Sequence, residues 1–486
     1  MPTNKQQRRA SNMSEYNVVI GLEVHSELNT TTKCFCRCQN EFGGEPNTHC
    51  CPVCTGMPGA LPVLNREAVK KAITMGLAVG CEINNYSVFE RKNYFYPDLS
   101  KAYQISQLEY PLCVGGHIDI EVDGKPKRIR LNRIHLEEDA GKLIHSSEGT
   151  LVDYNRGGVP LIEIVSEPDM NSAEEAVAYL EKLKATLQYV GVSECKMQEG
   201  NLRFDVNISV NKPGEPLGTR TELKNLNSFR AVLRAIKYES NRQIDVLEDG
   251  GEIIQETRRW DDNLGKTFSM RSKEDSQDYR YFPDPDIIAI QTTDEYINEI
   301  RNSLPRLAHE RCEDYIALGL SKQDAELLTS QKVFADYFEA VLAGYNEPKF
   351  VCNWITSEVF KRLNNEDDEI NIPVSAGNLA KLLRMYKEGE INQAGARQVM
   401  DELWLNDSDP VSIVEAKGLK QMNDTGAMLA IVQKIVNDNP KAVSELQAGN
   451  TKIMAFFIGQ AMKASAGKAN PKIVTDLVLQ LTKNKE

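Results

Sequence analysis

The chain has 486 residues, too many for one ordinary hydrophobic core, so its length predicts two to four domains. Its formal net charge of −13 at pH 7 argues against a protein that coats nucleic acid by bulk electrostatic attraction. A local basic surface is still compatible with this charge. After Asn450, six lysines stand against only Asp476 and Glu486, which suits contact with phosphates; a solvated helix face is the alternative interpretation.

The N-terminal segment MPTNKQQRRASNMSEYN is polar and lacks the apolar centre of a secretory signal, and no apolar run in the sequence reaches transmembrane length. We therefore expect a cytoplasmic protein without membrane contact, under reducing conditions. The Arg8-Arg9 pair and the early serines resemble a transit peptide only weakly, so an organelle is the less favoured alternative. Residues 1–15 are predicted to form a disordered extension.

The first predicted strand lies in VIGLEVHSEL and has two different faces. Apolar residues at positions 20, 22 and 24 alternate with Glu23, His25 and Glu27. Alternation with a period of two predicts an antiparallel strand that buries only its apolar face. Because a solvated face usually carries Lys, Thr and Glu, the Glu-x-His pattern indicates ligands for a hard cation, with an ordinary wet face as the alternative.

Six of the eleven cysteines fall between Cys34 and Cys54. Within this stretch, two close pairs flank a loop rich in turn residues, namely Cys36-x-Cys38 and Cys51-x-x-Cys54. Such clustering is typical of four thiolates that bind one zinc ion tetrahedrally. The stretch therefore predicts a zinc-binding loop.

Two alternatives to zinc stay open for these cysteines. They are reduced bystander thiols, or a pair of disulfides, which would require an oxidising compartment that the N-terminus does not lead to. The identity of the four ligands is also open, because Cys-x-Cys is less common than Cys-x-x-Cys. Cys34, His49 and Cys50 are therefore candidate substitute ligands.

Several further carboxylates stand where an unpaired charge would be costly. The run RIHLEEDAGK packs Glu137, Glu138 and Asp139 into one predicted turn next to His135, and Glu163 in PLIEIVSEPD has bulky apolar neighbours. Adjacent like charges repel unless they are solvated, paired with bases or neutralised by a cation. A bound Mg²⁺ would account for these groups together, and Mg²⁺ usually works with phosphates.

Two local elements follow from turn and cap chemistry. Asp123-Gly124 predicts a tight hairpin turn between strands at 117–122 and 125–131, because Asp-Gly supplies positive φ angles. Ser172 and Glu175 form a predicted capping box, and apolar residues at helical spacing continue the helix to a stop at Gly191.

The segment Leu202–Val210 repeats the pattern of the first strand. Its even-numbered residues are apolar, whereas its other face carries Arg203, Asp205, Asn207 and Ser209. The segment predicts a second antiparallel strand, which offers Asp-x-Asn to the same kind of cation.

Basic residues that could hold phosphates beside such a cation are scattered along the first half of the chain: Lys92, Arg203, Lys224, Arg258 and Arg259. The common nucleotide motifs are absent from the sequence. Gly265-Lys266-Thr267 resembles the end of a P-loop, but the position of the leading glycine holds Trp260. If the protein uses ATP, we expect it to do so on an antiparallel β surface with metal-binding carboxylates.

Near residue 300 the pattern changes from short alternating segments to almost continuous helix, for example over 376–387, 426–437 and 451–464. Asn365–Asp368 and Asn406–Pro410 are predicted breaks between helical segments. The fold class is thus predicted to be α+β, an antiparallel-sheet-rich part followed by helical parts.

Long ordered strings make the chain resemble one family. They are VIGLEVHSEL, FCRCQNEFGGEPNTHCCPVCTGMPGALP, FERKNYFYPDLSKAYQISQ, HLEEDAGK, PLIEIVSEPD, KMQEGNLRFDVNISV, TELKNLNSF, QETRRWDD and DYRYFPDPD. In this order they resemble the B subunit of the aspartyl/glutamyl-tRNA amidotransferase, over nearly the whole chain from Tyr16 to about Lys485.

The resemblance implies an ATP-dependent ligase that works within a heterotrimer. In that family, the B subunit uses ATP and Mg²⁺ to phosphorylate the side-chain carboxylate of Glu-tRNA(Gln) or Asp-tRNA(Asn), and ammonia then displaces the phosphate. The ammonia travels through a channel from the amidase (glutaminase) partner, which hydrolyses glutamine or asparagine, while a small third subunit wraps the other two. The implied products are Gln-tRNA(Gln) and Asn-tRNA(Asn).

The implied architecture has three domains. A cradle domain over residues 16–300 holds the site and includes the zinc loop at 34–54. An all-helical domain over 301–408 and a small helical tail domain over 409–486 follow, and both contact the tRNA. The local positive charge of the tail fits this contact.

The resemblance also implies roles for single residues. It places around Mg²⁺ the side chains of Glu23, His25, Glu138, Glu163 and Asp205, with Glu137 and Asn207 in support. The expected ATP contacts are Arg203, Asn207, Lys224, Arg258 and Arg259. The zinc ligands are expected at Cys36, Cys38, Cys51 and Cys54, where four thiolates leave no open position, so that zinc is structural.

Lys92 and Tyr94 resemble the channel-gating segment of the family near the ammonia exit. A buried lysine beside acids could hold or pass a proton there, and a phosphate contact or a structural ion pair is the alternative.

Two other classes of function compete with this one. A non-catalytic, zinc-bearing tRNA-binding adapter would turn over no ATP. A small-molecule carboxylate kinase or ligase would turn over ATP without tRNA. An amidotransferase requires both ATP and the misacylated tRNA.

Overall fold

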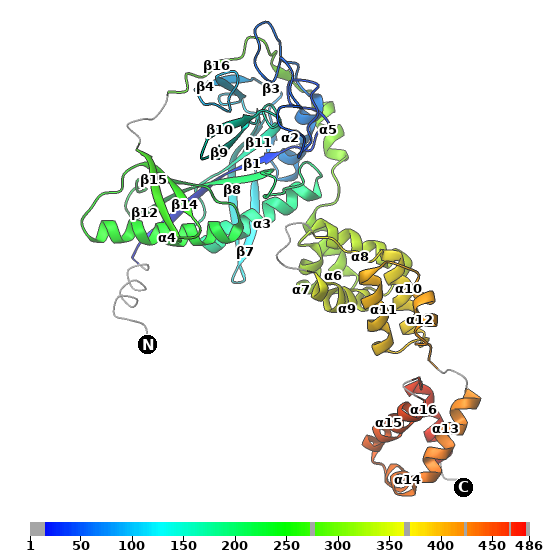
Figure 1. The fold of residues 1–486 in the computed structure, drawn as a ribbon. Helices are drawn as coiled ribbons and strands as arrows, with labels where there is room; N and C mark the ends of the chain where they lie inside the picture. Colours follow the sequence, from blue (N-terminus) through cyan, green and yellow to red (C-terminus); the bar gives the residue numbers. More distant parts are fainter. Residues whose placement is uncertain (1–14, 273–277, 364–369, 422–424, 466–467, 483–486) are drawn as a thin grey trace. The chain divides into compact units, whose positions relative to one another are not determined.

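The computed structural model describes residues 15–272, 278–363, 370–421, 425–465 and 468–482. The predicted extension over residues 1–15, apart from its last residue, and the predicted break at Asn365–Asp368 lie outside these ranges. The chain divides into two compact units: one runs to Glu310 and includes Ser330–Lys332, and the other comprises Arg311–Thr329 and the chain from Val333 onward. Figure 1 shows a first unit that contains the sheets and a second unit that is helical, which confirms the predicted α+β class.

A ten-stranded sheet forms the centre of the first unit. Its strands are β1 (Asn17–Glu27), β2 (Glu82–Ile83), β6 (Cys113–Val114), β7 (His117–Val122), β8 (Lys125–Glu138), β11 (Pro160–Ser166), β12 (Leu202–Asn211), β13 (Thr221–Lys224), β14 (Glu256–Asp261) and β15 (Lys266–Ser272). They lie in the order β15-β14-β13-β12-β1-β11-β8-β6-β2, with β7 paired to β8. Because only β13 and β14 run parallel in this sheet, it is mostly antiparallel, as the alternating sequence pattern predicts.

Small sheets and helices complete the first unit. The small sheets pair β3 (Tyr86–Ser87) with β17 (Ile290–Gln291), β9 (Lys142–Ser146) with β10 (Gly149–Asp153), and β4 (Glu90–Asn93) with β5 (Tyr103–Ser106) and β16 (Phe282–Pro283). The helices are α2 (Arg66–Ala78), α3 (Ala173–Tyr189), α4 (Phe229–Glu248) and α5 (Asp294–Asn302).

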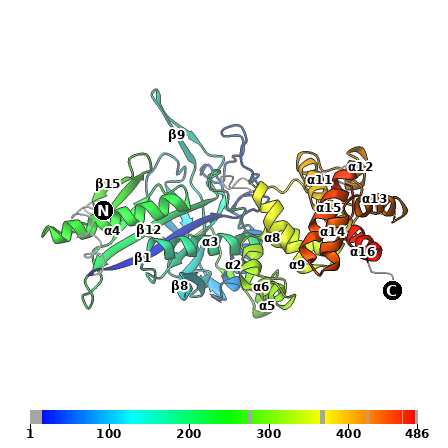
Figure 2. The same ribbon diagram turned by 90° about the horizontal axis from the view of Figure 1, so that it is seen from below.

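Helices α3 and α4 pack against one face of the large sheet, as Figures 1 and 2 show. Ile20, Leu22 and Val24 of β1 are no more than 1% exposed on this face, and they share one core with Leu180 of α3 and Val232 of α4. Burial of this face fixes the register of β1, since a slip by one residue would move its charged residues into the core. Glu23 and His25 are thereby held on the opposite face.

The predicted hairpin and the predicted helix are both confirmed. Val122 of β7 stands opposite Lys125 of β8, and the two residues between them have positive φ angles of 51° and 72°. At the start of α3, the side chain of Ser172 accepts a hydrogen bond from the backbone N–H of Glu175 at 3.1 Å. The helix ends just before Gly191, which has a φ of +67°.

The prediction of a turn at the three adjacent acids is wrong. β8 continues as a strand through Glu138, so that Glu137 and Glu138 point to opposite faces of the sheet. Each carboxylate finds its own counter-charge: Glu137 faces His25 and His135, whereas Glu138 pairs with Lys101. The repulsion between Glu137 and Glu138 is therefore avoided because their side chains point to opposite faces of the sheet.

The second unit consists of helices. They are α6 (Ala308–Ala317, which begins in the first unit), α7 (Lys322–Thr329), α8 (Lys332–Gly344), α9 (Pro348–Trp354), short helical segments at Ile355–Val359 and Phe360–Arg362, α10 (Ala376–Lys387), α11 (Gln393–Leu405), α12 (Pro410–Ala416), α13 (Thr425–Asp438), α14 (Pro440–Gln447), a short turn at Thr451–Ile453, α15 (Met454–Ala464) and α16 (Pro471–Thr482). Three of them confirm the helices predicted over 376–387, 426–437 and 451–464.

Two features of the second unit bear on its organisation. The predicted break at Asn406–Pro410 is the loop between α11 and α12. Helices α13, α15 and α16 enclose a separate small core around Met428, Phe457 and Val474. The predicted domain boundaries at 300–301 and 408–409 stay predictions. In the part of the chain that the structure describes, no helix has the length and apolar character needed to cross a membrane.

Candidate active site

The centre of the large sheet brings polar side chains from neighbouring strands together. β1 lies between β11 and β12, so that His25 stands opposite Glu163 on one side, and Glu23 stands opposite Asp205 on the other. β8 follows β11 and places His135 opposite Glu163. Glu137, two residues further along β8, lies on the same face as His135.

His25, Glu137 and Glu163 form what we call the first carboxylate group, with one ligand atom of each within 4.8 Å of the others. His25 Nδ1 lies 3.5 Å from Glu137 Oε1 and 4.0 Å from Glu163 Oε2. His135 Nε2 lies 3.5 Å from Glu137 Oε2 and 3.4 Å from Glu163 Oε2, and its side chain is only 3% exposed. His135 therefore links the two carboxylates from the protein interior.

The first carboxylate group fits a divalent cation. His25 Nδ1 is buried and has no hydrogen-bond partner, although it faces two carboxylates. Leaving a buried polar atom without a partner is costly, and a cation between the three side chains would remove that cost. One imidazole nitrogen with carboxylate oxygens is a donor set that a divalent metal such as Mg²⁺ or Mn²⁺ accepts, with water completing its coordination.

The charges in this group hold one another in their ionised forms. Burial would lower the pKa of His135, but the carboxylates of Glu163 and Glu137 outweigh burial and raise that pKa to about 9. In return, although burial would raise the pKa of Glu137, His135 and His25 hold it well below its usual value. The site therefore concentrates negative charge with a buried imidazolium behind it.

Glu23, Asp205 and Glu222 form the second carboxylate group, again with one ligand atom of each within 4.8 Å of the others. Asn207 donates a hydrogen bond to Glu23 Oε1 at 2.9 Å and so fixes its orientation. Lys224 Nζ lies 2.5 Å from Asp205 Oδ2 and 2.9 Å from Glu222 Oε1. The ammonium of Lys224 thus pairs with two of the three carboxylates and offsets one of their negative charges.

Glu138 is not brought together with the predicted cation ligands. It lies on the other face of β8, where its carboxylate accepts a hydrogen bond from the backbone N–H of Ile105 at 3.0 Å and pairs with Lys101 Nζ at 2.6 Å. Both side chains line a cavity of about 120 Å³ that also reaches Cys54. Glu138 therefore faces the cysteine loop, while Glu137 faces His25.

Lys92 lies beside the first carboxylate group and is surrounded by tyrosines. Its Nζ lies 4.9 Å from the ring centre of Tyr279 and 6.0 Å from that of Tyr94. Burial would lower the pKa of Lys92, but the charge of Glu137, with smaller contributions that include Glu163, raises it above its usual value. Lys92 is thus held as an ammonium, which favours holding a proton over releasing one.

The three arginines predicted to contact phosphates lie in different places. Arg203 shares the polar face of the sheet and pairs with Asp139 at 2.7 Å. Arg259 stands opposite Lys224 on β14 and is half exposed. Arg258 stands opposite the buried Leu223 and so lies on the helix-covered face, where it contacts Glu239 of α4 at 3.5 Å. The structure thus brings Arg203 and Arg259 to the polar face and leaves Arg258 out of it.

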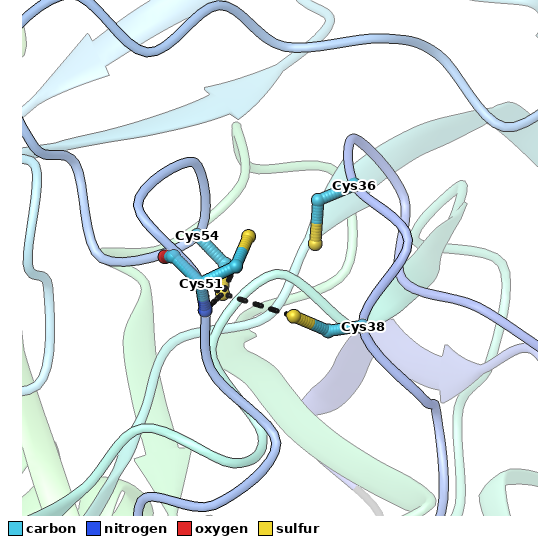
Figure 3. Close-up of side chains that lie close together, drawn as sticks. All are labelled: Cys36, Cys38, Cys51 and Cys54. Atoms are coloured by element: carbon cyan, nitrogen blue, oxygen red, sulfur yellow. Dashed lines mark hydrogen bonds between the residues drawn. The ribbon is translucent and has the colours of Figure 1, made fainter.

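The four predicted zinc ligands converge on one point. Sulfur atoms of Cys36, Cys38, Cys51 and Cys54 lie within 4.8 Å of one another, and Figure 3 shows the four thiols gathered between two loops. The Sγ of Cys54 is 3.9 Å from that of Cys51 and 4.0 Å from that of Cys38. A tetrahedron with metal–sulfur bonds of about 2.3 Å has edges of about 3.8 Å, so this spacing is compatible with zinc.

The alternatives for the cysteine loop are less compatible with the structure. All eleven cysteines are free in this structure, and the Sγ of Cys54 lies 3.9 Å and 4.0 Å from its two neighbouring sulfurs, whereas a disulfide requires about 2.05 Å. Of the candidate substitute ligands, Cys34 is fully buried, and burial raises its pKa well above the usual value. Cys50 Sγ lies 3.8 Å from Asn155 Oδ1, and His49 packs near Gly44. None of these three belongs to the converging set of described side chains.

Two family models and several named relatives match this chain. Residues 18–298 match the family model of the GatB/GatE catalytic domain, and residues 336–481 match that of the GatB domain. The chain belongs to this family. Three relatives are named as the B subunit of aspartyl/glutamyl-tRNA(Asn/Gln) amidotransferase: one from Caldicellulosiruptor saccharolyticus is 54% identical, one from Thermoanaerobacter pseudethanolicus 53%, and one from Persephonella marina 52%. Each alignment covers 96% of this chain, and 98%, 98% and 100% of the respective relatives.

Membership in the GatB family confirms the resemblance found in the sequence. It identifies the chain as the catalytic component of an ATP-dependent ligase, since the matched N-terminal model is the catalytic domain of the family. The strands that carry both carboxylate groups are β1, β8, β11, β12 and β13, and that model covers all of them except the first residue of β1. The relatives share the name of a B subunit, which indicates an enzyme with several different chains.

Sequence reasoning missed Glu222 of the second carboxylate group and Lys101, the ion-pair partner of Glu138. Glu222 alternates with the buried Thr221 and Leu223 in TELK, so the period-two pattern of this short strand could have found it. The sequence marks His135 only as a neighbour of the acids, whereas the structure places it against Glu137 and Glu163. Nothing local marks Lys101, because its partner Glu138 comes from a distant strand.

Proposed function

We propose that this chain activates the side-chain carboxylate of Glu-tRNA(Gln) or Asp-tRNA(Asn) and converts it to the amide. A carboxylate oxygen attacks the γ-phosphorus of ATP, and ADP leaves. Ammonia then attacks the acyl carbon of the resulting acyl phosphate, loses a proton, and phosphate leaves with that oxygen. The observation that carries the proposal is the polar face of five adjacent strands, β8, β11, β1, β12 and β13, where two carboxylate groups lie side by side within the catalytic domain of the family.

The two carboxylate groups suit the charge demands of this reaction. Mg²⁺, when bound, offsets the negative charge that gathers on the transferring phosphoryl group. In our proposal His25, Glu137 and Glu163 hold one cation, and His135 keeps the two carboxylates in position. Glu23, Asp205 and Glu222 form a second cation-binding site, in which Asn207 orients Glu23.

Lys224 is the strongest candidate for contact with the phosphates of ATP. In this structure its ammonium is held by Asp205 and Glu222. A cation bound by the same carboxylates would replace this charge and release Lys224 toward a neighbouring phosphate. Arg259, opposite Lys224 on the next strand, is placed to add a second positive charge, and Arg203 instead orders the loop at Asp139.

Ammonia must reach the acyl carbon without passing through water. We propose that it approaches along the cavity lined by Glu138 and Lys101, since Glu138 and Glu137 are successive residues on the two faces of β8. Glu138 could take a proton from ammonium on this path. Lys92, held as an ammonium between Tyr94 and Tyr279, then serves as a fixed positive charge beside the reacting groups.

The remaining predictions complete the proposed enzyme. The zinc loop at residues 34–54 has a structural role in a cradle domain at 16–300. A helical domain at 301–408 and a tail domain at 409–486 contact tRNA, with the tail lysines meeting its phosphates. The amidase (glutaminase) partner supplies ammonia, the small third subunit completes the heterotrimer, and the complex works in the cytoplasm.

An amidation assay tests the proposal. Purified heterotrimer is incubated with Glu-tRNA(Gln) or Asp-tRNA(Asn), Mg-ATP and glutamine, and the amino acid on the tRNA is identified by mass. We expect Gln-tRNA or Asn-tRNA only when ATP is present, and ADP formation only when misacylated tRNA is present. Full amidation without ATP would contradict the proposal, and so would ATP turnover that ignores tRNA, as expected of a small-molecule ligase. The adapter alternative predicts no ATP turnover at all.

A further inference from the structure

Lys33 is the only lysine among the described residues whose side chain is completely buried. It follows β1 and immediately precedes the cysteine loop. Its backbone N–H donates to the carbonyl oxygen of Cys38 at 3.0 Å, so the residue is part of the turn that presents the first cysteine pair. A long basic side chain in such a position needs partners for every donor and a counter-charge.

The donors of Lys33 are all accounted for. Its Nζ donates to the carbonyl oxygen of Gly157 at 2.7 Å, to that of Tyr154 at 3.2 Å, and to the Sγ of Cys54 at 3.7 Å. An ammonium has three N–H donors, and these three acceptors use them. Two of the acceptors are neutral carbonyl groups, so hydrogen bonding alone leaves the positive charge uncompensated.

Among the three acceptors that Lys33 Nζ contacts, only the Sγ of Cys54 can carry a negative charge. Among the described residues, Lys33 Nζ has no ion pair with a carboxylate within 4.0 Å, whereas Cys54 Sγ lies 3.7 Å from it. Neutral thiols or disulfides would leave the buried ammonium unpaired, which is strongly unfavourable. Four thiolates on one Zn²⁺ carry a net charge of −2, which an adjacent ammonium partly neutralises.

We propose that Lys33 is the charge partner of the zinc–thiolate cluster and ties that cluster to the turn at 154–158. The same turn accepts the backbone N–H of Cys34 at Gly158 at 2.8 Å, and Gly158 in turn donates to the carbonyl oxygen of Asp139 at 2.8 Å. β11, which carries Glu163, begins two residues later. Lys33 is thus a positioning residue that connects the metal cluster to the start of a strand of the active site.

The test measures zinc affinity directly, in the purified full-length complex. Zn²⁺ is titrated against a chromophoric zinc chelator for the wild type and for Lys33→Met, Lys33→Gln and Lys33→Arg. We expect the Met and Gln variants, which lack the charge, to bind zinc about ten-fold or more weakly, as is usual when a hydrogen-bond partner of a metal ligand is removed. The Arg variant keeps the charge and should therefore bind zinc more tightly than the Gln variant.

Lys71→Met serves as the matched control. Lys71 lies on α2, is 16% exposed and donates to the backbone carbonyl of Gly191, so its loss removes a comparable contact outside the cysteine loop. The Lys71→Met variant should bind zinc with the same affinity as the wild type. If Lys33→Met does not fold, the zinc affinities of Lys33→Gln and Lys33→Arg are compared instead. Both of these side chains retain N–H groups that can donate to the carbonyls of the turn.

Zinc binding by Lys33→Gln as tight as that of the wild type would overturn the role of Lys33. The inference rests on the proposed zinc occupancy and not on tRNA amidation. A wild-type complex that binds no zinc would therefore remove the zinc proposal itself, whereas equal affinities of wild type and variant would remove only the role given to Lys33.

Discussion

Replacing Glu163 by glutamine is expected to abolish amidation of misacylated tRNA, with a loss of about 10³-fold or more in kcat, or roughly 4 kcal/mol in the barrier. Glu163 stands between His25 and His135 and supplies the first carboxylate group with one of its two negative charges. Glutamine has the same shape but no charge, so the first carboxylate group should bind its cation more weakly while the strand is retained. The rate of Gln-tRNA formation measures this effect.

A second measurement separates this role from a structural one. Titration of Mn²⁺ into the nucleotide-free complex should show weaker binding for Glu163→Gln, while the affinity for tRNA stays unchanged. Glu82→Gln is the matched control, because Glu82 is an exposed carboxylate on β2 of the same sheet. Wild-type amidation by Glu163→Gln would exclude Glu163 from the site.

Loss of the metal cluster is expected to be the largest effect on stability. Joint replacement of Cys51 and Cys54 by alanine removes two of the four converging sulfurs. We expect the variant to bind no zinc and to lose about 4 kcal/mol or more of stability, because binding of a structural metal contributes directly to folding. Its melting temperature, followed by calorimetry, should fall by roughly 10 °C.

Cys50→Ala is the control for this experiment. Cys50 belongs to the same loop, but its sulfur contacts Asn155 and is not part of the converging set. The Cys50→Ala variant should keep its zinc and melt within about 2 °C of the wild type, as expected for a small change outside the cluster. Unchanged zinc content in the double variant would show that the metal is held by other residues.

The parts of the fold that were predictable have local causes. β12 alternates apolar and polar residues along its whole length and β1 does so from Leu22 to His25, so their two faces follow from the sequence alone. The starts of α3 and α10 follow from the caps at Ser172 and Ser375, whose side chains accept hydrogen bonds from the backbone. In the site, the same alternation placed Glu23, His25 and Asp205 on a shared face.

The parts that were not predictable depend on neighbours distant in sequence. The adjacent acids of β8 suggested a turn because the sequence does not show their counter-charges. His25 and Lys101, which supply those charges, come from other strands and loops. Arg258 looked like a phosphate ligand by composition, yet the parallel pairing of β14 with β13 turns it toward Glu239. Two-residue strands such as β2 and β6 are too short to show any period.

The most direct test of the account follows one oxygen atom. Glu-tRNA(Gln) labelled with ¹⁸O in its side-chain carboxylate is amidated by the heterotrimer with Mg-ATP and ammonium, and the phosphate released is analysed by mass spectrometry. If this chain activates the carboxylate as an acyl phosphate, each phosphate carries one oxygen from the substrate, and Glu163→Gln releases almost no labelled phosphate. Formation of Gln-tRNA with phosphate that contains no ¹⁸O would contradict the account.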